Sequence, residues 1–165
     1  MLHGKKIVLR AVTLSDTDTL YQWENDKANW TVSGTKKPFT KKEIKNFITN
    51  QKDIYLDKQL RLMIETRDKG QGTGDKKILV GCIDLFEFNE QNLTAGIGIL
   101  IDKKYRKNGL ASEALSLLIT YSFEILNLKE LYCNMSEDNT VSLKLFQKHK
   151  FKITGKKSNI HSLRL

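Results

Sequence analysis

The sequence predicts one domain of the mixed α/β class, and three observations lead to this prediction. The chain has 165 residues, which is a typical length for a single domain, and 39% of them are hydrophobic. It contains no internal repeat and no low-complexity linker, and its only proline is Pro38. Apolar residues alternate in some segments, as in strands, and recur every three or four positions in others, as in helices. We therefore treat residues 1–165 as one folding unit.

The first part of the chain predicts a strand followed by two helices. Residues 6–12, KIVLRAV, alternate and predict the first strand. Ser15 stands where an N-cap is expected, before a helix with acidic residues in its first turn. Thr40 is the predicted N-cap of a second helix, and Glu43, three residues later, completes a capping box.

The next part predicts an antiparallel meander of three strands. Its members are residues 60–66, 78–88 and 95–101, which are apolar segments joined by polar loops. A further strand is predicted at residues 130–135.

Two helices and a last strand complete the predicted domain. The first helix follows Gly109, and its apolar positions are spaced by three and four: Ala114, Leu117, Leu118, Tyr121 and Ile125. The second helix has Asp138 or Asn139 as its N-cap and ends near His149. Residues 151–155, FKITG, begin the last strand.

The cysteines and histidines give no metal signature. Cys82 and Cys133 are far apart and have apolar neighbours, which favours buried thiols over a disulfide or metal ligands. His3, His149 and His161 are also scattered along the chain. We expect no metal.

The net charge of +9 is compatible with acidic partners, but a solvated lysine-rich surface is the favoured explanation of the lysines. No dense basic block with interleaved aromatic residues is present, so nucleic-acid binding is not expected, except indirectly through a ribosomal target. The N-terminal segment lacks the apolar region of a signal peptide. No stretch approaches the roughly 20 apolar residues of a membrane helix, so we expect a cytoplasmic protein without membrane contact.

Two glycine-containing segments are candidates for phosphate binding. Residues 70–74, GQGTG, lead into a predicted strand, which favours a hairpin loop, because phosphate loops lead into a helix. Residues 102–115, DKKYRKNGLASEAL, do lead from a strand into a helix. Gly109 permits a tight turn there, and Arg106 and Lys107 add positive charge beside amides that lack helical partners. On the residues alone, a pyrophosphate site and a solvated basic loop are equally good interpretations.

A resemblance to a known family favours the pyrophosphate site. Residues 106–111, RKNGLA, match R/Q-x-x-G-x-G/A, the acetyl-CoA pyrophosphate motif of the GNAT superfamily of N-acetyltransferases. A second segment resembles the family's N-x-x-S-x-x-L-Y/F-x-x-x-G-F pattern through Asn139, Ser142, Leu145, Phe146 and Phe151. The opening LRAVTLSDTDTLYQWEND is similar to the branch of ribosomal-protein N-terminal and spermidine acetyltransferases. The similarity runs from about residue 5 to residue 155.

The resemblance implies a splayed central sheet, flanked by helices, with acetyl-CoA between residues 95–101 and 130–135. The backbone of Ile99, Leu100 and Ile101 would pair with the pantetheine arm. The pyrophosphate would be bound by Arg106, Lys107, Asn108, Gly109, Leu110, Ala111 and Ser112. The helix that follows residues 130–135 would contribute Asn139, Ser142 and Phe146.

The sequence departs from the family pattern where catalytic groups are usual. Gly96 stands where many members have a glutamate base, and Phe146 stands where many have a tyrosine that protonates the thiolate. Lys150 replaces the glycine of the usual Gly-Phe pair.

Replacements for these groups can be proposed. The Ser142 hydroxyl is a candidate thiolate acid, although a first-turn serine that bonds to backbone is an equal alternative. Asp84 is a candidate base acting through water, with an ordinary surface carboxylate as the alternative, and Glu87 is the next candidate. Trp23 and Trp30 either line an acceptor pocket or belong to the core.

The acceptor is expected to be a primary amine, and the charge of one segment bears on its class. Residues 27–58 contain eight lysines against Glu43, Asp53 and Asp57. Like charges disfavour a polycationic acceptor, so the segment argues against a polyamine and fits a protein N-terminus or an amine with acidic groups.

The C-terminus predicts a truncated sheet. The chain ends at SNIHSLRL soon after FKITG, so we expect the final strand to be missing or supplied by a partner chain. An unpaired sheet edge promotes association, which predicts a homodimer.

An acetyl-CoA-dependent N-acetyltransferase acting by direct attack of the amine is the leading functional hypothesis. A polyamine acetyltransferase is one alternative within this class. An acyl-CoA-binding protein with little or no catalysis is a second alternative, motivated by Gly96 and Phe146. A basic nucleic-acid-binding module is a third, and it would show steeply salt-dependent binding.

Overall fold

A computed structural model describes residues 1–33, 35–68 and 76–165 of the chain. The strands are β1 (Leu2–His3), β2 (Ile7–Ala11), β3 (Leu60–Asp68), β4 (Lys76–Asn89), β5 (Thr94–Ile101), β6 (Glu130–Ser136), β7 (Lys152–Lys157) and β8 (Ile160–Arg164). The helices are η1 (Leu14–Asp16), α1 (Thr17–Asn25), α2 (Lys27–Ser33), α3 (Lys41–Asn50), α4 (Ile54–Asp57), η2 (Lys103–Tyr105), α5 (Leu110–Glu124) and α6 (Thr140–Lys148). No helix in the described ranges is long and apolar enough to cross a membrane.

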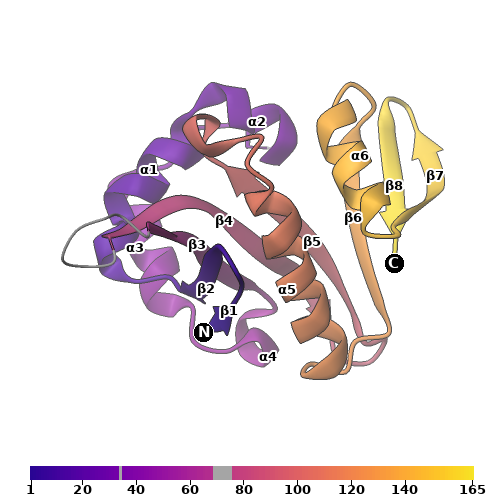
Figure 1. Cartoon of the computed structure of the whole chain (residues 1–165), viewed down its shortest axis with the longest axis horizontal. Coiled ribbons are helices and arrows are strands. Elements are labelled where there is room, and N and C mark those ends of the chain that lie inside the picture. The colour runs from indigo at the N-terminus through magenta and orange to yellow at the C-terminus, as the bar shows by residue number, and fades with distance from the viewer. Residues whose placement is uncertain (34, 69–75) are drawn as a thin grey trace.

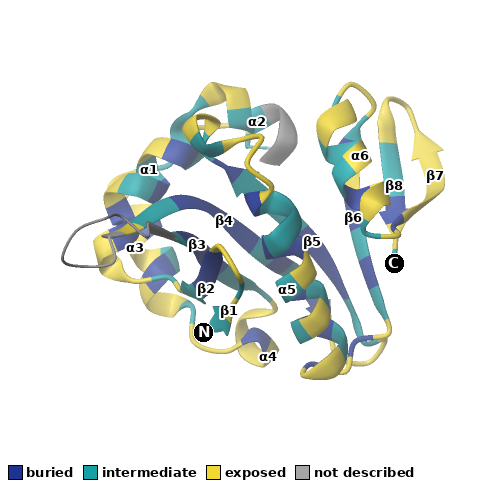
Figure 2. Ribbon diagram, in the orientation of Figure 1, coloured by how far each residue is buried: buried dark blue, intermediate teal, exposed yellow. Residues whose placement is uncertain are grey.

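One mixed sheet organises the chain, so the predicted α/β class is confirmed (Figure 1). Its strand order is β1-β2-β3-β4-β5-β6-β8-β7, and the predicted meander is the antiparallel series β3-β4-β5. Buried residues are concentrated in the central strands, whereas the outer strand β7 is exposed (Figure 2).

Helices cover both faces of the sheet. On one face, α1 and α3 place Leu20, Trp23, Ile44 and Ile48 against Met63 and Cys82. On the other face, α5 and α6 pack on the larger core cluster through Ala114, Leu115, Leu118 and Phe146. The Thr40–Glu43 capping box begins α3 as predicted, because Thr40 Oγ1 accepts from the Glu43 N–H at 3.2 Å.

The sheet splits between β5 and β6, its one parallel pair in the described ranges. These strands pair only at Thr94–Glu130, Ala95–Leu131 and Gly96–Tyr132. Beyond Gly96 they diverge, and β6 continues with β8 as its partner. The implied splayed sheet is therefore present, and Gly96 and Tyr132 mark the vertex of the V.

The predicted truncation of the sheet is wrong. Residues 160–164 form β8, which lies between β6 and β7 and pairs with both strands. A two-residue turn at Ser158 and Asn159, with φ of 54° at Ser158, reverses the chain directly after β7. Leu163 is fully buried opposite Cys133, and its burial stabilises a strand where the sequence predicts only a short C-terminal extension. The homodimer prediction rested on a missing final strand, and that strand is present.

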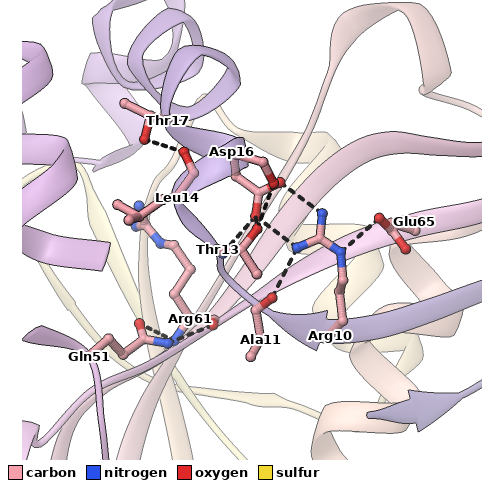
Figure 3. A network of polar contacts seen from close by, with 10 residues as sticks. Arg10, Ala11, Thr13, Leu14, Asp16, Thr17, Gln51, Arg61 and Glu65 are labelled. Carbon is pink, nitrogen blue, oxygen red and sulfur yellow. Dashed lines mark hydrogen bonds and ion pairs between the residues drawn. The ribbon is translucent and has the colours of Figure 1, made fainter. Parts of the chain in front are cut away.

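An ion-pair network joins β2 to η1 and β3, and it replaces the predicted Ser15 cap (Figure 3). The Arg10 guanidinium donates to both Asp16 oxygens at 2.7 and 2.8 Å and to Glu65 Oε1 at 2.7 Å. Asp16 Oδ2 also accepts from the Thr13 N–H at 2.8 Å, which completes a capping box with Thr13 as the N-cap. Ser15 instead bonds to the Thr13 hydroxyl.

We expect Asp16→Asn to lower the free energy of unfolding by about 1–3 kcal/mol at pH 7, because a charged hydrogen-bond acceptor is lost. Burial alone would raise the pKa of Asp16, but Arg10 and Thr13 outweigh it and the pKa is lowered. A lowered pKa stabilises the fold above about pH 4, and this contribution is lost as the pH falls through the folded value. Urea unfolding from pH 7 to pH 3 should show the difference between variant and wild type shrinking below about pH 4.

The matched control is Asp18→Asn, because the Asp18 carboxylate is exposed and pairs with Lys41 on the surface. Its effect should be much smaller. Equal effects of the two substitutions would show that the Arg10 network does not stabilise the fold.

Candidate active site

The start of α5 is an open helix N-terminus at the C-terminal end of β5. Gly109 is its N-cap, with φ of 77° and ψ of 0°, a left-handed conformation that favours glycine. The first helical hydrogen bond runs from the Glu113 N–H to the Gly109 carbonyl at 3.1 Å. The amides of Leu110, Ala111 and Ser112 therefore lack helical partners, and an anion is stabilised at such a position.

Space is available in front of this helix start. A Cβ added to Gly109 would meet no atom within 4 Å among the described residues. Lys107 also has a positive φ, of 64°, so two neighbouring turns curve the chain here. The arrangement can bind a phosphate or pyrophosphate group through backbone amides.

Side-chain contacts hold this loop to the end of β5. Arg106 Nε donates to the Ile101 carbonyl at 2.9 Å, and Asn108 Nδ2 donates to the Tyr105 carbonyl at 3.2 Å. Asp102 accepts from the Lys104 N–H at 2.9 Å and from Trp23 Nε1 at 3.0 Å, and these bonds hold the pKa of Asp102 below its usual range. The core position of Trp23 is thus confirmed, and its indole also anchors the loop.

The predicted residues on α6 have different environments. The Asn139 side chain accepts from the Ser142 N–H at 3.2 Å and caps the helix. Ser142 is half-buried, and its hydroxyl has no hydrogen-bond partner among the described residues. Phe146 is only 3% exposed and meets the Phe151 ring edge-on, with ring centroids 5.0 Å apart.

His149 connects the two helices of the candidate site, which the sequence did not predict. Its Nε2 lies 2.8 Å from the hydroxyl of Ser112 in the first turn of α5. Burial, followed by the charge of Lys148, lowers the pKa of His149, so the neutral imidazole is favoured. The contact joins the end of α6 to the start of α5.

The face of the sheet opposite α5 is shaped by an aromatic ring above Gly96. A Cβ on Gly96 would lie 2.2 Å from Phe86 Cε2, which is much closer than two nonbonded carbon atoms can approach. Phe86 also meets Tyr132 edge-on, with centroids 6.0 Å apart. The ring occupies the volume that a side chain at position 96 would need, which explains the glycine.

We expect Gly96→Ala to destabilise the fold by about 1–3 kcal/mol, because Phe86 must move. Gly98→Ala is the matched control on the same strand, since its Cβ would meet Phe86 at an ordinary 3.6 Å. Chemical unfolding of both variants tests this expectation. Equal losses would mean that the Phe86 ring yields freely.

Asp84 is part of a partly buried ion-pair network. Its two oxygens accept from Arg61 Nε and Nη2 at 2.8 and 2.7 Å, and Arg61 Nη1 also donates to Glu24 at 2.5 Å. Each oxygen of Asp84 already accepts a charged hydrogen bond from Arg61, so the carboxylate is held in a bidentate pair. This arrangement does not favour Asp84 as the base. Neither Arg61 nor Glu24 carried a signal in the sequence.

Trp30, Cys82 and Cys133 are shielded from solvent to different extents. Trp30 on α2 is half-buried, and its Nε1 donates to the Glu24 carbonyl at 2.8 Å. Cys82 and Cys133 are buried free thiols, and burial raises the pKa of each to about 12. The described residues contain no cluster of three or more potential metal ligands. Residues 70–74, GQGTG, lie outside the described residues.

Comparison with known proteins gives one family and a consistent set of relatives. The family model described as an acetyltransferase (GNAT) domain matches residues 6–152. The spermidine N(1)-acetyltransferase of Escherichia coli K12 is 31% identical over 103 residues, which cover 62% of this chain and 53% of that protein. The alignment thus spans about half the length of that relative. The uncharacterized N-acetyltransferase p20 of Bacillus licheniformis is 27% identical over 157 residues, covering 93% of this chain and 83% of that protein.

Solved structures show the same fold. The spermidine N-acetyltransferase of Vibrio cholerae, in complex with CoA and spermine, superposes with a TM-score of 0.83 at 19% identity. The superposition covers 98% of this chain and 96% of that one. The acetyltransferase (GNAT family) from Bacillus anthracis gives a TM-score of 0.79 at 17% identity, covering 99% and 96% of the two chains.

Proposed function

The chain belongs to the GNAT acetyltransferase family, and from this premise we propose that it transfers the acetyl group of acetyl-CoA to a primary amine. The observation that carries the proposal is the open α5 N-terminus, with its RKNGLA sequence, beside the split between β5 and β6. Acetyl-CoA supplies the acetyl group as an activated thioester.

The residues fit the parts of acetyl-CoA in order. The amides of Leu110, Ala111 and Ser112, with the charges of Arg106 and Lys107, suit the pyrophosphate. The backbone of residues 99–101 faces the split in the sheet, where an extended pantetheine arm can add like a strand. We also propose contacts from Asn108, Gly109, Asn139, Ser142 and Phe146.

We propose Ser142 as the group that protonates the departing thiolate. Ser142 is half-buried in the first turn of α6, and its hydroxyl has no partner among the described residues, so it is available as a donor. Phe146, at the position of the usual tyrosine, has no proton to donate. For Asp84 we propose a positioning role, in which the Asp84–Arg61–Glu24 network orients the acceptor amine.

The acceptor is proposed to be a protein N-terminus or a small amine. The lysines of residues 27–58 lie on an outer segment, whereas the sheet face beside the vertex carries the carboxylates of Asp84 and Glu87, with Glu24 close by. Carboxylates favour a cationic amine. A polyamine is the second candidate. The carboxylates of this face counter the repulsion expected from the lysines of residues 27–58, and spermidine acetyltransferases are among the relatives.

Self-association remains part of the proposal on different grounds. The Vibrio cholerae spermidine N-acetyltransferase has been described as dodecameric. We propose that this chain also assembles with itself, and light scattering of the purified protein tests this directly.

Calorimetric titration with acetyl-CoA, CoA and ATP tests the cofactor site. Both CoA forms should bind more tightly than ATP, since only they carry the pantetheine arm. A thiol-release assay with spermidine and a peptide with a free N-terminus then tests transfer. CoA binding without turnover would indicate the acyl-CoA-binding alternative, and no CoA binding would contradict the proposal.

A further inference from the structure

A β-bulge in β4 redirects one carboxylate next to the vertex of the V. Phe86 pairs with Gly96 and Asn89 pairs with Thr94, so Glu87 and Phe88 together oppose Ala95. Glu87 has φ of 50°, which is uncommon for a residue with a side chain. Phe88 is buried in the core cluster of the α5 face, and Glu87 is turned toward β6. Bulges of this kind re-aim side chains, often beside active sites.

The redirected carboxylate bonds to a tyrosine. Tyr132 Oη donates a short hydrogen bond to Glu87 Oε2. Tyr132 stands opposite Gly96 at the last β5–β6 pair, and its ring packs against Phe86. Burial and the Glu87 carboxylate raise the pKa of Tyr132 to about 12, so its hydroxyl keeps its proton at neutral pH.

The vertex is where the reactive end of a bound acetyl-CoA is expected. With the pyrophosphate at the start of α5, the arm runs back along β5 from Ile101 toward Gly96. Five residues of strand span roughly 16 Å. The thioester end of the arm therefore comes close to the Phe86, Gly96 and Tyr132 cluster.

Among the charged side chains near the vertex, Glu87 is the one available to accept a proton. Arg61 occupies both oxygens of Asp84. Arg164, across from Tyr132 on β8, is paired with Glu130. Glu87 Oε1 has no hydrogen-bond partner among the described residues, and the residue is exposed.

We propose that Tyr132 and Glu87 form the proton relay that deprotonates the acceptor amine, with Tyr132 facing the amine and Glu87 as the final proton acceptor. The relay takes the place of the base that Gly96 and the overlying Phe86 ring exclude. It rests on the proposed acetyl transfer and adds to it Tyr132, together with the pairing that connects Tyr132 to the candidate base Glu87.

Two protons leave the acceptor nitrogen in the proposed reaction. Tyr132 Oη takes one proton from the ammonium group, directly or through one water, while its own proton passes to Glu87. The neutral nitrogen then bonds to the thioester carbon, and the carbon–sulfur bond breaks with the electron pair on sulfur. Ser142 protonates the thiolate and recovers the second proton lost by nitrogen. Glu87 finally releases its proton to water.

Glu87→Gln and Tyr132→Phe test the relay in the full chain, with spermidine and a peptide with an N-terminal serine as acceptors. Each variant should lower kcat by about 100- to 10,000-fold at pH 7, with acetyl-CoA affinity unchanged by calorimetry. The double variant should lose no more than the worse single variant, because the two groups act as one unit. The control is Glu90→Gln, which removes a surface carboxylate paired with Lys58 and should keep full activity.

The pH profile separates a relay from a structural role. As the pH rises toward the pKa of the acceptor amine, solvent supplies the neutral amine, so the deficit of Glu87→Gln should shrink. A deficit that stays constant with pH, or a Glu87→Gln variant as active as wild type, would overturn the relay alone. A wild-type chain that neither binds acetyl-CoA nor releases thiol with either acceptor would overturn the proposed function and the relay with it.

Discussion

Replacing Gly109 with glutamate should abolish acetyl-CoA binding while the fold is kept. The new carboxylate would stand at the open start of α5, where the pyrophosphate is proposed to bind. Like charges in contact cost several kcal/mol, so we expect the dissociation constant to rise by more than about 100-fold. Calorimetric titration of the purified variant measures this directly.

The fold should tolerate this change. A Cβ at Gly109 meets open space among the described residues, so the cost is the left-handed backbone, about 1–2 kcal/mol. Gly109→Gln carries nearly the same bulk and the same backbone cost without the charge, and it should weaken binding much less. Unchanged affinity in Gly109→Glu would remove the proposed cofactor site.

Local signals in the sequence predicted the parts of the fold that depend on near neighbours. The Thr40–Glu43 box is set by residues three positions apart, and α3 begins there. The final strand was missed because residues 160–164 are stabilised by β6 and β7 rather than by their own pattern. Only Leu163 of this strand is buried, so no apolar run marked it.

The candidate site divides in the same way. The pyrophosphate loop is one contiguous segment, so its motif could be read directly from residues 106–111. The catalytic groups depend on strand register, which places Asp84 beside Arg61 and Gly96 beside Phe86. The bulge at Glu87 depends on the same register. Sequence spacing does not report register, so it predicts neither the Arg61 pair of Asp84 nor the bond between Tyr132 and the candidate base Glu87.

Arg61→Met should destabilise the fold by up to about 3–5 kcal/mol, because two largely buried carboxylates would lose the cation that compensates them. The Arg61 side chain is 14% exposed, and its loss would leave Glu24 and Asp84, at 16% and 18%, without their shared cation. The Arg61 guanidinium lies over the Phe47 ring, 5.0 Å from its centroid, and methionine can pack on the same ring without the charge. The Arg61 backbone keeps its bonds to Gln51 (Figure 3). The decrease in the free energy of unfolding should therefore come mainly from the loss of the positive charge. Urea unfolding at pH 7 measures this decrease.

A second substitution separates charge from packing. Adding Asp84→Asn to Arg61→Met removes one of the stranded carboxylates, so the double variant should be more stable than Arg61→Met alone. Arg164→Met is the control, because that arginine pairs with Glu130 at 52% exposure and should matter little. If Asp84→Asn instead added its own loss to that of Arg61→Met, the two side chains would stabilise the fold independently. Arg61 and Asp84 would then have no favourable coupling energy, which contradicts the proposal that they act as one network to orient the acceptor amine.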